Sequence, residues 1–213
     1  RAYNISSKKS RVVYNGFDFY RNRVLNKNLK SELEIKTDLV VTMIGNVNDN
    51  KDYKSFIEVA KKIIKSRDDV TFLSIGHVST NQFALVEPFL NNKHNKIKFL
   101  GFRMDIENII AFTDIGLLCT YSEGISNSIM EFMANEIPVV TTDLIGGSKE
   151  IIENNHSGFI CSNENLEVTI NMLLNDSDKR KKLGLRGRQI IENNFSISQM
   201  IKSYEDIYNS IFW

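Results

Sequence analysis

Two acidic residues and a group of small polar residues stand close together between positions 122 and 131. Glu123 lies in a Ser-Glu-Gly turn, and Glu131 follows eight positions later in a stretch with helical spacing. The turn leads into that helix through Ser126, Asn127 and Ser128, so capping oxygens and unpaired backbone N–H groups gather there. The N-terminus of a helix that follows a parallel strand attracts anions. The stretch therefore suits a ligand that carries both phosphate and hydroxyl groups.

Short apolar runs alternate with amphipathic stretches along the chain, and these define the elements that position the polar residues. The runs predict buried strands over 39–45, 70–76, 97–101, 115–120, 137–141 and 158–161. Helical spacing predicts helices over 52–66, 81–90, 105–112 and 125–134, a short helix ending at 152, and a helical remainder from 164. Strands that alternate with helices imply an α/β fold with a doubly wound parallel sheet of the Rossmann-like type.

Several polar and aromatic residues fall where the predicted strands end. Asn46, Gly76, Phe102 and Glu123 all lie at or just beyond a strand end. Ligands in a doubly wound sheet bind outside the carboxyl ends of the strands. We therefore expect these four residues to converge on one crevice.

The composition narrows the class of protein. The 213 residues carry 27 basic and 26 acidic side chains, so the net charge creates no electrostatic field that would favour binding to nucleic acid. Cys119 and Cys161 lie in apolar runs and fit reduced thiols in a cytosolic chain better than a disulfide. No apolar run approaches the roughly 20 residues that cross a bilayer. Neither paired His and Cys residues nor clustered Asp residues suggest a metal site.

The stretch SEGISNSIMEFMANEIPVV, residues 122–140, resembles the signature of family-4-type retaining glycosyltransferases. These belong to the GT-B group (glycosyl transferases group 1) and use nucleotide-sugar donors. The matching positions are Glu123, Gly124, Asn127, Glu131 and Pro138. Ile125 replaces the usual aromatic residue, which alters the shape of the sugar pocket. The segment Val12–Asp18 likewise resembles the start of that family's second domain, just after the interdomain linker.

The resemblance implies roles for the charged residues. It assigns Glu131 to the ribose diol of the donor and Glu123 to hydroxyls of the donor sugar near the reacting carbon. Gly45 and Lys51 match a loop whose cations neutralise the diphosphate, although Asn46 stands where arginine is common. Asn46 can donate a hydrogen bond to phosphate but brings no charge. The alternative for Lys51 is a solvated loop lysine, and for the two acids solvent-facing helix charges.

Further donor contacts follow from the same resemblance. The backbone N–H groups of Ser126, Asn127 and Ser128 would face the leaving diphosphate. The segment Phe99–Arg103 resembles one whose backbone reads the edge of the base, so Phe102, Arg103 and Met104 would flank it. An arginine exposed in a turn is an equal interpretation of Arg103. Gly146, Gly147 and Glu150 match a stretch that shapes the crevice floor, with an ordinary loop as the alternative.

The resemblance covers nearly the whole chain but only the second domain of the family, and this predicts the domain organisation. We expect a linker over 1–18, a donor-binding domain over 19–195 and, over 196–213, a helix that packs back on a missing N-terminal half. The chain does not begin with methionine, so we read it as a piece of a longer polypeptide that is inactive in isolation.

The implied activity is metal-independent transfer of a hexose from a UDP- or GDP-linked donor, with retention of configuration. No cofactor is implied. The acceptor would be a polysaccharide, lipopolysaccharide or glycolipid held by the missing half, in the cytoplasm, with peripheral membrane contact left open. A non-catalytic nucleotide-sugar-binding module and a GT-B-fold sugar-nucleotide epimerase are the alternatives.

Overall fold

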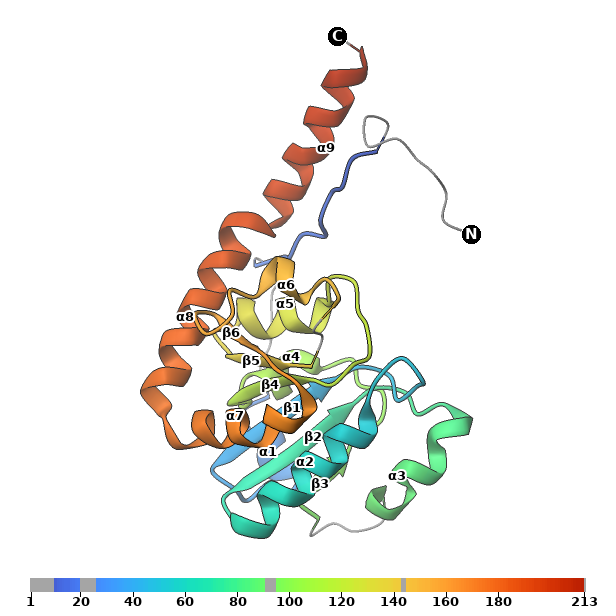
Figure 1. Ribbon diagram of the computed structural model, residues 1–213, viewed down its shortest axis with the longest axis vertical. Helices are drawn as coiled ribbons and strands as arrows, with labels where there is room; N and C mark the ends of the chain where they lie inside the picture. The colour runs from blue at the N-terminus through green and yellow to red at the C-terminus, as the bar shows by residue number, and fades with distance from the viewer. Residues whose placement is uncertain (1–9, 20–25, 91–94, 143–144, 213) are drawn as a thin grey trace.

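The structure, a computed structural model, describes residues 10–19, 26–90, 95–142 and 145–212. The first half of the predicted linker, residues 1–9, lies outside these ranges. Figure 1 shows a twisted sheet with helices on both faces and one long helix that extends away from it. This is the layered α/β architecture that the alternating pattern predicts.

The sheet has six strands in the order β3-β2-β1-β4-β5-β6, and every neighbouring pair is parallel. The strands are β1 (Leu39–Ile44), β2 (Val70–Ile75), β3 (Ile97–Phe99), β4 (Ile115–Leu118), β5 (Val139–Thr141) and β6 (Gly158–Ile160). The strand order reverses between the two central strands, β1 and β4. The carboxyl ends of these two strands therefore form the topological switch point of the sheet. The predicted doubly wound, Rossmann-like sheet is confirmed, and the strands begin or end slightly inside the predicted limits.

Helices connect the strands and cover both faces of the sheet. They are α1 (Leu29–Glu32), α2 (Tyr53–Ser66), α3 (Phe83–Leu90), α4 (Ile106–Ile110), α5 (Asn127–Ala134), α6 (Ser148–Ile151), α7 (Asn163–Asn175), α8 (Ser177–Asn194) and α9 (Ile197–Phe212). A 3-10 turn, Thr80–Gln82, precedes α3 and accounts for the start of the predicted helix over 81–90.

One helix prediction needs correction, and another is confirmed. The helix predicted from residue 125 begins at Asn127, because Ser126 has extended backbone angles and serves as the N-cap residue. The predicted helical remainder from residue 164 is confirmed and consists of the three helices α7, α8 and α9. Asp176 separates the first two because its side chain accepts a hydrogen bond from the Lys179 N–H group and caps α8.

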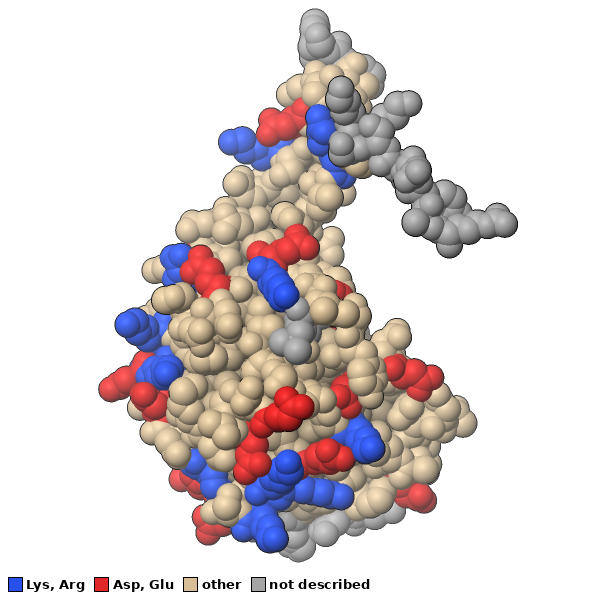
Figure 2. All heavy atoms as spheres, viewed as in Figure 1, with Lys and Arg blue, Asp and Glu red and all other residues tan. Residues whose placement is uncertain are grey.

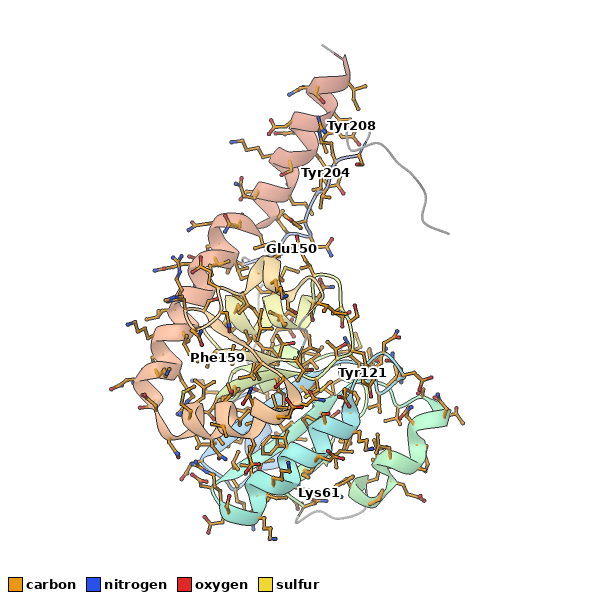
Figure 3. The ribbon with its side chains drawn as sticks, in the orientation of Figure 1. Lys61, Tyr121, Glu150, Phe159, Tyr204 and Tyr208 are labelled. Carbon is orange, nitrogen blue, oxygen red and sulfur yellow. The ribbon has the colours of Figure 1, made fainter. Side chains whose placement is uncertain are left out.

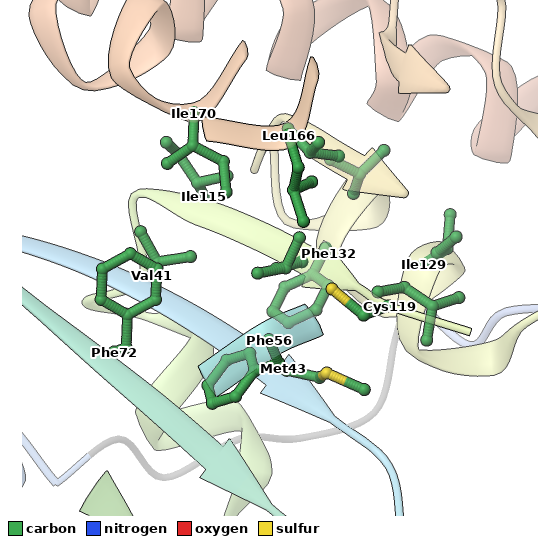
Figure 4. Close-up of a cluster of buried hydrophobic side chains, with 14 of the residues drawn as sticks. Val41, Met43, Phe56, Phe72, Ile115, Cys119, Ile129, Phe132, Leu166 and Ile170 are labelled. Atoms are coloured by element: carbon green, nitrogen blue, oxygen red, sulfur yellow. The ribbon is translucent and has the colours of Figure 1, made fainter. Parts of the chain in front are cut away.

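Two clusters of buried hydrophobic side chains lie between the sheet and its helices, and Figure 4 shows part of the larger one. Phe56 from α2 and Phe132 from α5 are fully buried in it. Gly116 on β4 leaves room for the Phe132 ring, since a Cβ atom there would overlap the ring carbons. Both cysteines are free thiols, and burial raises the pKa of Cys119 well above its usual value. Cys161 is only partly buried.

Residues 10–19 and helix α9 form the part of the molecule farthest from the sheet (Figure 1). Phe17 pairs with Ser196 as an isolated parallel bridge, and the Tyr14 ring packs on Phe195 at 5.3 Å between centroids. Beyond this anchor α9 keeps an exposed stripe, which includes Tyr204 and Tyr208 (Figure 3). Packing of that stripe against a missing half stays a prediction.

Candidate functional site

A cavity of about 550 Å³ lies alongside α5, from Asn127 at its start to Asn135 just beyond its end. Five residues predicted to contact a donor line it: Phe102, Arg103, Met104, Asn127 and Glu131. The segment Asn15–Asp18 and Met200 of α9 close another side. The volume is in the range of pockets that hold small molecules.

Helix α5 presents its polar face to this cavity. Asn127 and Glu131 are four residues apart, so they lie one above the other on the same side of the helix. Ile129, Phe132 and Met133 occupy the opposite side and are buried in the core. The burial of the apolar side therefore aims the Glu131 side chain at the cavity.

Two serines of the motif, Ser126 and Ser128, do not line the cavity. Ser126 and Ser128 are buried, at 6% and 8% exposure, and their hydroxyl groups hydrogen-bond each other at 3.0 Å. Neither side chain caps the helix. The predicted oxygens lie at the start of the helix, where Ser126 is the N-cap residue, but its hydroxyl makes no capping hydrogen bond. The proposed contacts of the backbone N–H groups with phosphate are a separate prediction.

A lysine–glutamate ion pair lies at the switch point of the sheet. The Nζ atom of Lys51, from the loop after β1, contacts Oε2 of Glu123, from the loop after β4. The two side chains are only 14% and 28% exposed, so water screens the pair less than it would a surface pair. β1 and β4 are neighbours in the sheet, and this brings together two residues that are 72 positions apart in the sequence.

Backbone hydrogen bonds fix the loop that carries Lys51. Asp52 N–H donates to the Cys119 carbonyl at 3.0 Å, and the Thr120 hydroxyl donates to the Asn50 carbonyl at 2.9 Å. Gly45 lies under the lysine stem, since a Cβ atom at that position would be 3.3 Å from Lys51 Cε. The loop after β1 is thereby held against the end of β4.

Asn46 acts within the protein as well as at its surface. Its side-chain oxygen accepts a hydrogen bond from the His77 backbone N–H group at 3.0 Å, and this ties the loop after β1 to the loop after β2. The His77 ring stacks on Phe102. Asn46 and Phe102, both expected at the crevice, are therefore linked through His77.

The glycine pair after β5 has a steric function. Gly147 donates its N–H to the Glu123 carbonyl at 2.8 Å. A Cβ atom at Gly147 would come within 2.7 Å of the Gly124 carbonyl carbon. Only glycine permits this close approach, so Gly147 supports the turn that carries Glu123. Glu150, from the same stretch and labelled in Figure 3, accepts a hydrogen bond from Tyr14.

The predicted residues thus fall into two neighbouring groups. Glu131 and the residues after β3 share the 550 Å³ cavity, whereas Lys51, Glu123, Gly45 and Asn46 lie at the ends of β1 and β4 and do not line it. The convergence of Asn46, Gly76, Phe102 and Glu123 on one crevice stays a prediction. Arg103 is held by a double hydrogen bond to Asp105 at 2.6 and 2.8 Å, which favours its interpretation as an arginine of a turn.

A buried carboxylate beside Lys51 escaped the sequence analysis. Asp52 is 5% exposed and caps α2, and it accepts hydrogen bonds from Ser55, Tyr121 and Asn163. Burial alone would raise its pKa, but these hydrogen bonds outweigh burial and hold the pKa below its usual value. Tyr121 and Asn163 also line a cavity of about 370 Å³ beside Asp52 (Figure 3). A lone Asp before a helix predicts a cap, but not these distant partners.

We expect Asp52→Ala to lower the free energy of unfolding by about 0.5–2 kcal/mol at pH 7, the range for a lost N-cap. Because the native pKa is lowered, this contribution is fully present above the unfolded-state value of about 3.9 and is lost as the pH falls through the native value. Urea denaturation at several pH values should show the two proteins converging in acid. Asp68→Ala, at an exposed acid, is the control; a constant gap down to low pH would contradict the argument.

Two general observations concern the distribution of surface charge and the apolarity of the helices. Acidic and basic side chains intermingle on the face seen in Figure 2, in line with the near-zero net charge. Among the helices in the described ranges, none combines the length and apolarity that crossing a membrane takes.

Comparison with known proteins identifies the family. Residues 26–190 match the family described as Glycosyl transferases group 1, which is more than half of the chain. The chain belongs to the group 1 glycosyltransferases. The family expected from the signature is thus confirmed, and the family-4 subtype stays a prediction.

Curated relatives agree with this assignment. The chain is 24% identical over 213 residues to N-acetyl-alpha-D-glucosaminyl L-malate synthase of Bacillus anthracis, covering 96% of this chain and 55% of that protein. It is 27% identical to an Escherichia coli UDP-Gal:alpha-D-GlcNAc-diphosphoundecaprenol alpha-1,3-galactosyltransferase, with 96% and 55% covered. The chain therefore spans about half the length of the curated relatives it matches.

Solved structures of GT-B glycosyltransferases share the fold. Anabaena HepE in complex with UDP superposes with a TM-score of 0.84 at 23% identity, covering 96% of this chain and 58% of HepE. The C-terminal domain of the group 1 glycosyltransferase LpcC from Francisella tularensis gives 0.69 at 22% identity, with 87% and 97% covered. The GT-B-type fold expected from the resemblance is confirmed.

Proposed function

We propose that this chain is the donor-binding half of a retaining glycosyltransferase that takes a hexose from a UDP-linked donor. The single observation that carries the proposal is the position of Glu131, which lines a 550 Å³ cavity within the matched family region. A carboxylate can accept both hydroxyls of a ribose diol, and such charge-assisted hydrogen bonds are the strong ones. The cavity would hold the nucleoside.

The Lys51–Glu123 pair would serve the reacting end of the donor. When the bond between the sugar carbon and the phosphate oxygen breaks, negative charge grows on the diphosphate, and Lys51 is the cation closest to Glu123. A charge held in place before the reaction stabilises the transition state without a cost of reorganisation. Glu123 would accept hydrogen bonds from sugar hydroxyls. No step needs a metal ion.

The remaining assignments rest on the family. An acceptor hydroxyl would attack the sugar carbon on the face that the diphosphate leaves, and its proton would pass to the departing phosphate oxygen. The acceptor, a polysaccharide or lipid-linked glycan, would be held by a further domain. The relatives support this class, since one is named a capsular polysaccharide biosynthesis glycosyltransferase, CapM of Staphylococcus aureus, 25% identical over 202 residues.

Calorimetric titration with UDP, GDP and ADP in EDTA tests the proposal. We expect saturable binding of UDP, and weaker binding of the purine nucleotides. EDTA removes divalent cations, so binding that persists there supports a metal-independent site. Binding of none of the three nucleotides, in a chain that unfolds cooperatively, would overturn the proposal.

A further inference from the structure

The Asp52 side chain joins three separate segments of the chain beside the loop that carries Lys51. Its Oδ1 atom accepts hydrogen bonds from the Ser55 N–H group in α2 at 3.0 Å and from the Tyr121 hydroxyl, after β4, at 3.3 Å. Its Oδ2 atom accepts from the Ser55 hydroxyl at 2.6 Å and from the Asn163 amide, at the start of α7, at 3.1 Å. We call these four contacts the Asp52 joint.

The joint occupies the whole carboxylate. An ionised carboxylate offers about four acceptor positions on its two oxygens, and the donors of the joint fill them. Asp52 is also only 5% exposed. Its acceptor positions are therefore taken up by the protein, and any contribution that it makes to a ligand site comes through its neighbours.

Two of the four contacts go beyond a helix cap. A cap at the start of α2 requires only the hydrogen bond from the Ser55 N–H group to the carboxylate. The Tyr121 hydroxyl and the Asn163 amide come from segments that are distant in the sequence, and both residues are exposed, Tyr121 at 61%. Because these two bonds cross between segments, they restrain the position of the buried carboxylate relative to β4 and α7.

The joint lies directly beside the Lys51–Glu123 pair. Lys51 immediately precedes Asp52 in the chain. On the other strand of the contact, Tyr121 lies two residues before Glu123. The two backbones run side by side here, since Lys51 forms an antiparallel bridge with Thr120. Rotation of the backbone at Lys51 would displace the Asp52 side chain from its partners, so the joint restrains the direction of the lysine.

We propose that Asp52 is a positioning residue that holds Lys51 toward the diphosphate of the donor, with Tyr121 and Asn163 as the ties that fix it. A cation that is held in place before the ligand arrives needs no reorganisation when the diphosphate binds. A loop that can take up other arrangements binds more weakly, in proportion to the fraction of molecules that hold the competent one. The inference rests on the proposed nucleotide-sugar function and adds how the cation of the site is held.

Two neutral substitutions test the joint without altering its charge or the cap of α2. Tyr121→Phe removes one hydroxyl, and Asn163→Ala removes the amide. We expect each to weaken UDP binding by about two- to tenfold, the population shift that one net hydrogen bond supports. Uridine, which has no phosphate for Lys51 to bind, should bind each variant like the wild type. Isothermal titration measures both ligands.

The Lys51→Met background provides a readout that a merely structural role would not move. The cation has gone in that background, so Tyr121→Phe should no longer weaken UDP binding, and the double-mutant cycle measures the coupling. Tyr208→Phe and Asn209→Ala, at exposed residues of α9, are the matched controls and should bind UDP like the protein into which they are introduced. Thermal unfolding of each variant reports whether the fold is intact.

The outcomes separate this proposal from the proposed function. If the wild type binds UDP and neither Tyr121→Phe nor Asn163→Ala weakens it, the positioning role is overturned and the proposed function stands. Equal losses for UDP and uridine, or a loss that persists in Lys51→Met, would show that the joint supports the fold alone, and this too overturns the role. If the wild type binds no nucleotide, the proposed function fails, and the positioning role fails with it.

Discussion

Replacing Glu131 with alanine is expected to weaken UDP binding by about 10- to 150-fold, the loss of a hydrogen bond to a charged group of about 1.5–3 kcal/mol. Glu131 lines the cavity from the fifth position of α5, where it shares a face with Asn127. Alanine is a strong helix former, so the substitution leaves the helix itself intact. Isothermal titration with UDP measures the effect.

Two companion variants locate the cause of that loss. Glu131→Gln keeps the shape and one acceptor oxygen but removes the charge, so its affinity is expected to lie between those of the wild type and Glu131→Ala. Glu58→Ala, at an exposed acid of α2, should bind like the wild type. 2′-Deoxy-UDP lacks one of the two ribose hydroxyls, and Glu131→Ala should discriminate less between it and UDP. Unchanged UDP affinity in Glu131→Ala would exclude the diol role.

Lys51 and Glu123 are expected to change UDP affinity in opposite directions. Lys51→Met removes the cation and should weaken UDP binding by about 10- to 150-fold while sparing uridine. Glu123→Gln removes an anion that contacts Lys51. UDP carries no hexose for Glu123 to bind, so with UDP alone this carboxylate only competes with the diphosphate for the lysine. Glu123→Gln should therefore bind UDP more tightly than the wild type.

A double variant and a comparison of ligands test whether Glu123 and the diphosphate compete for Lys51. In Lys51→Met the Glu123→Gln substitution should raise UDP affinity much less, because the competition for the lysine has gone, and the double-mutant cycle measures that coupling. With UDP-hexose the effect of Glu123→Gln should have the opposite sign: the variant should bind this ligand more weakly than the wild type, since the hexose hydroxyls donate hydrogen bonds to the carboxylate. Equal effects of Lys51→Met on UDP and uridine would show that Lys51 acts on the fold and not on the diphosphate.

The pairing of Lys51 with Glu123 also bears on which ligand provides partners for both charged side chains. The pair is mostly buried, and removal of one partner of such a pair leaves the other charge poorly solvated. A diphosphate approaching Lys51 offers a second anion in place of the Glu123 carboxylate, and the sugar hydroxyls then offer partners to that carboxylate. The complete nucleotide sugar therefore satisfies both charges, whereas the nucleotide alone satisfies one.

The sequence by itself determined the elements and the family. Apolar runs of β-branched residues alternate with helical spacing, and these local patterns predicted all six strands of the sheet. The interval between Asn127 and Glu131 is short and helical, so their common face follows from the period of the helix. The resemblance of residues 122–140 as a whole to the family signature indicated the family, and the match over residues 26–190 confirmed it.

Only the tertiary structure decided which distant residues meet. Lys51 reaches Glu123 because β1 and β4 are neighbours at the switch point, and strand order is set by packing of the whole chain rather than by local pattern. The same holds for Asn46, His77 and Phe102, which come from loops after three different strands. Ser126 occupies the N-cap position that the sequence indicates, but its hydroxyl is buried and hydrogen-bonds to Ser128 instead of to a helix N–H group, which only tertiary packing decides.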